Sequence, residues 1–119
     1  MNTPNIIKNI ALIIDNEVLN LGKMNSIIDE ARSLGNLRFI NVFGQCADVD
    51  TYLTKVAATG CKFKHIPDSS SLSMGIEVAE MMHNPFYRPD LVCVVSEQSN
   101  LDCLVNYLKG FRTDMVQWS

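Results

Sequence analysis

The 119-residue sequence lacks the features that would assign it to several large classes of protein. No apolar run reaches the roughly 18–20 residues that a membrane-spanning helix needs, and no basic region precedes an apolar stretch at the N-terminus. The four cysteines form no C-x-x-C pair, which excludes the common spacing of zinc ligands. We therefore expect a cytoplasmic protein with reduced thiols and no membrane partner.

Neither positive nor negative charge dominates the sequence. Ten Lys and Arg against 13 Asp and Glu give a formal net charge of −3, and the basic residues form no run. This argues against a strongly basic nucleic-acid-binding face but leaves room for a local one. Glycine-rich phosphate loops of the dinucleotide or Walker type are absent. With 47% hydrophobic and 19% charged residues, the composition is typical of one ordered domain that spans residues 1–119.

Apolar runs alternate along the chain with segments of helical periodicity, and glycine or proline marks most joins. This pattern predicts five strands and four helices: strands at 9–15, 37–43, 61–66, 91–96 and 113–118, and helices at 21–34, 48–59, 73–83 and 98–109. Strict alternation predicts an α/β fold, a three-layer α/β/α sandwich with a mostly parallel five-stranded sheet of Rossmann-like type.

The carboxyl ends of parallel strands meet at one edge of the sheet, where ligands and metal ions usually bind. Asp15 closes the first strand, and Ser96, Glu97 and Gln98 follow the fourth. The sequence therefore predicts a site at these two strand ends.

Four stretches at these places carry a resemblance to a known family: Ile14-Asp15-Asn16-Glu17, Val42-Phe43-Gly44, Met74-Gly75-Ile76-Glu77-Val78 and the segment from Val94 to Leu101. From Ile10 to about Val116 the chain resembles the NYN domains of the PIN-like nuclease superfamily. The resemblance implies a PIN-like fold and a Mg²⁺ or Mn²⁺ site for RNA cleavage. It also implies that Asp15 and Glu77 are catalytic residues and metal ligands.

The chain departs from the family pattern at the segment that follows the fourth strand. Gln98 and Asn100 stand where two aspartates would be, and Val18 and Met74 replace an expected asparagine and lysine. Amides offer carbonyl oxygens but no negative charge, whereas Mg²⁺ prefers anionic oxygen. We therefore expect a degenerate site in which metal binding and cleavage are weak or lost, lined by Asn16, Ser96, Glu97, Gln98 and Asn100.

Simpler structural roles are open for the same side chains. Asp15 is suited to accept backbone N–H bonds from the next turn, and Ser96 to cap a helix. Glu77 and Glu80 can form a solvated helix face, and Asp102 can be a favourable charge in the first turn of a helix.

Three functions compete on these grounds. The first is a metal-dependent ribonuclease, with Asp15 and Glu77 as the main ligands. The second is a non-catalytic module that binds RNA, a protein partner or a second copy of itself. The third is a phosphoreceiver-like signalling domain, because Asp15-Asn16-Glu17 is loosely similar to an acidic phosphorylation pocket and Asp68 could accept the phosphate. A shared fold does not choose between the first two.

Overall fold

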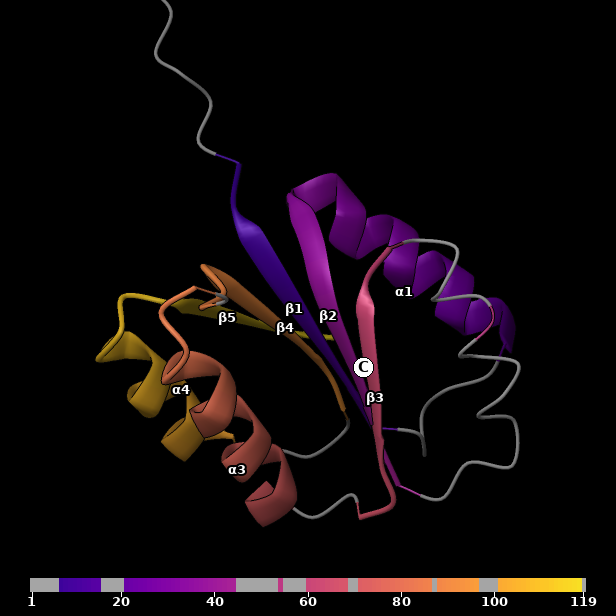
Figure 1. The fold of residues 1–119 in the computed structure, drawn as a ribbon. Coiled ribbons are helices and arrows are strands. Elements are labelled where there is room, and N and C mark those ends of the chain that lie inside the picture. The colour runs from indigo at the N-terminus through magenta and orange to yellow at the C-terminus, as the bar shows by residue number, and fades with distance from the viewer. Residues whose placement is uncertain are drawn as a thin grey trace, which may run out of the picture.

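A computed structural model of the chain describes residues 7–15, 21–44, 54, 60–68, 71–86, 88–96 and 101–118. Figure 1 shows a twisted sheet with helices on both of its faces. The elements are β1 (Asn9–Asp15), α1 (Leu21–Leu34), β2 (Asn36–Phe43), β3 (Lys62–Ile66), α3 (Ser71–Met82), β4 (Leu91–Val95), α4 (Asp102–Lys109) and β5 (Asp114–Trp118).

All five predicted strands and three of the predicted helices occur in the structure, most within two residues of the expected bounds. The helix predicted at 48–59 lies outside the described residues apart from Thr54, which is helical. One predicted start is wrong: the last helix begins at Asp102, not at 98, because Leu101 already has a non-helical ψ of 13°. No helix in the described part of the chain is long and apolar enough to cross a membrane.

The five strands pair in the order β3-β2-β1-β4-β5, and every pairing is parallel. The predicted α/β class and parallel sheet are thus confirmed. The chain extends the sheet in one direction from β1 to β3 and then returns to add β4 on the other side of β1. The order reverses between β1 and β4, which is the position where open α/β sheets usually form ligand crevices.

This order also bears on the phosphoreceiver hypothesis. In flavodoxin-like folds, which include receivers, β1 lies between β2 and β3. Here β1 lies between β2 and β4. The strand order therefore gives that hypothesis no support.

Alternation along the strands divides the interior into two apolar layers. Even-numbered residues of β1 face α1 in the first layer, whose helix residues are Met24, Ile27, Ile28 and Ala31. Odd-numbered residues of β1 face α3 and α4 in the second layer. Its helix residues are Met74, Val78, Met82, Leu104 and Leu108, joined by Leu101 just before α4. Figure 1 shows α1 on one side of the sheet and α3 with α4 on the other. Because β1 and β4 are covered on both faces, their sequences are continuous apolar runs.

Candidate functional site

Asp15 lies at the carboxyl end of the central strand β1, as predicted. It is only 4% exposed, and its place in the alternation of β1 puts it on the α3/α4 side of the sheet, with Ala11 and Ile13. Asp15 also takes part in an interaction with another part of the protein, so the residue is not without a partner. A buried charged group at a strand end needs such partners to offset its lost hydration.

Ser96 lies beside Asp15 at the end of the neighbouring strand. Ile14 and Val95 are paired in register, so Asp15 and Ser96 are the next residues of two adjacent parallel strands. Ser96 is fully buried, its N–H donates to the Trp118 carbonyl at 2.9 Å, and its carbonyl accepts from Gln117 Nε2 at 3.0 Å. These bonds fix Ser96 to β5. The helix-cap role proposed for Ser96 is wrong for α4, whose N-cap position is Leu101 and has no side-chain cap bond.

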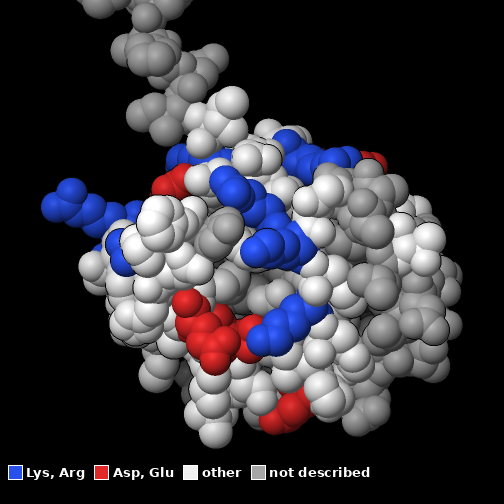
Figure 2. Space-filling model, in the orientation of Figure 1, with Lys and Arg blue, Asp and Glu red and all other residues white. Residues whose placement is uncertain are grey.

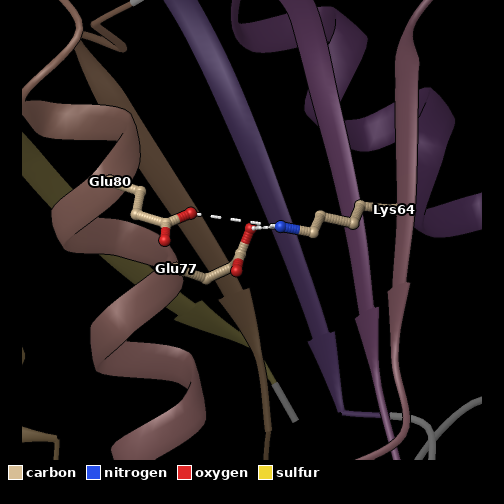
Figure 3. A network of polar contacts seen from close by, with 3 residues as sticks. All are labelled: Lys64, Glu77 and Glu80. Carbon is tan, nitrogen blue, oxygen red and sulfur yellow. Dashed lines mark hydrogen bonds and ion pairs between the residues drawn. The ribbon is translucent and has the colours of Figure 1, made fainter.

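Glu77 lies on α3 and points toward the edge strand β3 (Figure 3). Its Oε1 accepts a hydrogen bond from Lys64 Nζ at 2.6 Å, and Glu80 Oε2 is 4.0 Å from the same nitrogen. About 13% of the Glu77 side-chain surface is exposed, compared with 54% for Lys64. The helix-face interpretation of Glu77 is therefore incomplete, because a strand 13 residues away supplies its partner.

The ion pair changes the electrostatics of Glu77. The hydrogen bond to Glu77 raises the pKa of Lys64 above its usual value, against the lowering effect of partial burial, and the charges of Glu77 and Glu80 act in the same upward direction. Lys64 is therefore a full positive charge at neutral pH. A cation that approached Glu77 would have to compete with this ammonium group.

Glu77 and Asp15 share the α3/α4 side of the sheet but belong to different parts of it. Lys64 is in register with Asn41, which is in register with Ile13, two residues before Asp15. With a rise of about 3.3 Å per residue and about 4.8 Å between strands, the Cα atoms of Lys64 and Asp15 are roughly 12 Å apart. The ion pair thus holds Glu77 toward the edge strand, with β2 between it and the strand that carries Asp15.

The donor set of the described residues does not fit a Mg²⁺ or Mn²⁺ site. Among them, no group of three His, Cys, Asp or Glu side chains is arranged to hold a metal ion. Of the two predicted ligands, one is neutralised by Lys64. The other predicted site residues, Asn16, Glu97, Gln98 and Asn100, lie outside the described residues. Asp102 is in the first turn of α4, in agreement with its helix-charge interpretation.

Both histidines and the buried Cys93 have neighbours within the fold. His65 Nε2 lies 2.7 Å from the carbonyl oxygen of Gly44, and His83 Nε2 lies 3.3 Å from the Tyr107 hydroxyl. Cys93 is fully buried in β4, and this burial raises the pKa of its thiol to about 11, with a smaller contribution from the charge of Glu30. A thiol with that pKa is protonated at neutral pH and is a poor nucleophile.

A pocket beside Lys64 was not predicted from the sequence. It has a volume of about 410 Å³ and lies between α3 and the edge of the sheet. Figure 2 shows acidic and basic atoms meeting at a hollow on this face. The sequence did contain one indication of this pocket. Asn41 is the one polar residue in the run Phe39-Ile40-Asn41-Val42-Phe43. We call this cavity the β3 pocket, with Phe39, Asn41, Lys62, Lys64, Glu77 and Met81 among its lining residues.

Comparison of the chain with protein-family models, with curated proteins and with solved structures gave no match.

Proposed function

We propose that this chain is an NYN-like domain that binds single-stranded RNA and in which metal-dependent cleavage is weak or lost. The observation that supports the proposal best is the position of Asp15. Its buried carboxylate ends the central strand at the reversal of strand order, beside Ser96 at the end of β4. That is where the resemblance to the NYN domains requires the first acid of the site.

Weak or lost cleavage follows from the charges around this position. Cleavage by a bound Mg²⁺ needs carboxylates that hold the ion and leave it free to stabilise charge on the phosphate. Glu77 already pairs with Lys64 at 2.6 Å, and positions 98 and 100 carry amides. Asp15 and Glu97 are then the anionic groups left among the residues expected at the site. Two carboxylates give a weaker site for a dication than three or four.

RNA remains a suitable ligand without the metal. Lys62 lines the β3 pocket on the same side of the sheet as Asp15 and supplies positive charge close to an apolar wall, whereas the charge of Lys64 is compensated by Glu77. Proteins that bind single strands combine such charges with aromatic side chains on which bases stack. Phe39 provides an aromatic side chain in the same pocket.

A protein partner is the second candidate, and exposed apolar side chains favour it. Leu72, Ile76 and Phe86 are 72%, 52% and 85% exposed on α3 and just after it. Exposed apolar clusters of this kind are common at protein interfaces. If the RNA experiment below gives no binding, this candidate replaces the first.

The experiment is a titration of a fluorescently labelled short single-stranded RNA, followed by anisotropy, in a chelator and again in Mn²⁺. We expect saturable binding in both, with a Kd on the order of 10⁻⁵ M that weakens as salt rises. Lys62→Ala should weaken binding, whereas Lys109→Ala removes an exposed lysine of α4 and should not. Binding that appears only with Mn²⁺, or no binding at all, would contradict the proposal.

A further inference from the structure

The β3 pocket contains a buried polar group that the fold itself leaves unused. Asn41 is only 5% exposed and lies on β2 between Ile13 of β1 and Lys64 of β3. Its side-chain amide makes no hydrogen bond within the part of the chain that the structure describes. Every fully buried side-chain nitrogen or oxygen in that part does have a partner. The amide of Asn41 must therefore open onto the pocket, where its donor and acceptor face outward.

An amide at this place is unusual for a central strand. It adds polar atoms to an apolar run and packs less well than a branched apolar side chain. The neighbours of Asn41 along β2 are apolar, and valine or isoleucine would suit the strand better. The side chain is therefore best explained by a ligand that pairs with both its donor and its acceptor.

The walls of the β3 pocket restrict the chemistry of that ligand. Phe39 and Met81 provide apolar surface. The Lys64–Glu77 ion pair lies on the β3 side of Asn41, and its two opposite charges cancel. The floor is thus neutral, which disfavours a phosphate or a carboxylate as the buried group. A flat, neutral group with adjacent donor and acceptor atoms matches an amide floor and an aromatic wall. Nucleobases have these properties, and asparagine pairs with two such atoms at once on adenine.

Size and surface charge agree with this assignment. A volume of about 410 Å³ lies within the range of small-molecule sites. Lys62 is exposed on the same side of β3 as Lys64, two register positions from Asn41, where it can meet the sugar-phosphate of a base bound inside. Glu80 lines the same pocket, and its Oε2 is 4.0 Å from Lys64 Nζ, so Lys64 also partly offsets the negative charge of Glu80.

We propose that the β3 pocket binds a single nucleobase through the side-chain amide of Asn41, with Phe39 and Met81 against the base. This inference rests on the proposed function and deepens it: the base belongs to a single-stranded RNA whose backbone passes Lys62. A free nucleotide offers the same chemistry, so the test separates the two sources.

The test measures binding of the four ribonucleoside monophosphates by calorimetry and of labelled single-stranded RNA by anisotropy. Ribose 5-phosphate, which lacks the base, is the chemical control. Asn41→Leu keeps the side-chain size and removes the amide, and Asn106→Leu makes the same change at an exposed position of α4. Asn41→Ser is a second variant, too short to pair with two atoms. Thermal unfolding checks that each variant folds.

We expect at least one nucleoside monophosphate and the RNA to bind the parent, and both Asn41 variants to weaken them about tenfold. Asn106→Leu should have no effect, and ribose 5-phosphate should not bind. If a nucleotide binds in a way that depends on Asn41 but RNA does not bind, the pocket inference holds with a free nucleotide as the ligand, and the proposed function is wrong. If RNA binds equally well to the Asn41 variants, the pocket inference is wrong and the proposed function holds. Equal binding of ribose 5-phosphate, or no binding by either ligand, would overturn the pocket inference as well.

Discussion

Gly35→Ala is expected to destabilise the fold by about 3 kcal/mol, at the upper end of the usual cost of overpacking. Gly35 lies between α1 and β2, and a Cβ there would collide with the backbone carbonyl of Lys8 and crowd Ile10 Cδ1 at 3.3 Å. The same carbonyl accepts a hydrogen bond from Asn36 N at 2.7 Å, so it cannot move away without loss. Thermal denaturation should show a fall in Tm on the order of 10 °C.

Gly75→Ala is the matched control for this prediction. Gly75 lies within α3. Apart from its chain neighbours and the backbone of α3, no atom of the described residues lies within 4 Å of the position its Cβ would take. Alanine is favoured over glycine inside a helix by roughly 0.5–1 kcal/mol, so this variant should be slightly more stable than the parent. Similar Tm values for the two variants would show that the packing around Lys8 and Gly35 is not as described.

Gln98→Asp combined with Asn100→Asp is expected to raise Mn²⁺-dependent RNA cleavage by about tenfold or more over the parent. The two changes restore carboxylates at the positions where the NYN resemblance expects them. Single changes around metal ligands commonly alter activity 10–100-fold, so two added ligands should have at least a comparable effect. Denaturing gels of labelled RNA, with and without a chelator, measure the gain.

Two controls make this prediction specific. Asn25→Asp with Asn106→Asp adds the same charge at exposed positions of α1 and α4 and should leave cleavage at the parent level. Asp15→Asn, added to the repaired protein, should abolish the gain. A repaired protein that folds and binds Mn²⁺ yet cleaves no RNA would show that positions 98 and 100 are not the missing part of the site.

The fold could be predicted from the sequence because its signals are local. The buried strands β1 and β4 are continuous apolar runs, and the helix positions Met24, Ile28 and Ala31 repeat at helical spacing. The start of α4 could not be placed, because Ser96 carries a side chain typical of helix caps. The structure shows an uncapped start at Leu101 and Asp102 instead.

The site was only partly predictable, for a physical reason. Asp15 was predicted because a carboxylate directly after an apolar strand must lie at the edge of the sheet. The partner of Glu77 was not, because the contact with Lys64 depends on how α3 crosses β3. The role of Asn41 depends in the same way on which part of the sheet the helices leave uncovered. Sequence spacing contains neither piece of information.

The most direct measurement of the central claim follows one labelled single-stranded RNA, incubated with the parent protein in Mn²⁺, on native and denaturing gels from the same samples. We expect a retarded complex on the native gel and full-length RNA on the denaturing gel, over a time in which the Gln98→Asp, Asn100→Asp protein shortens the RNA. Rapid shortening of the RNA by the parent, suppressed by Asp15→Asn, would contradict the proposed loss of cleavage and show that the parent is an active ribonuclease.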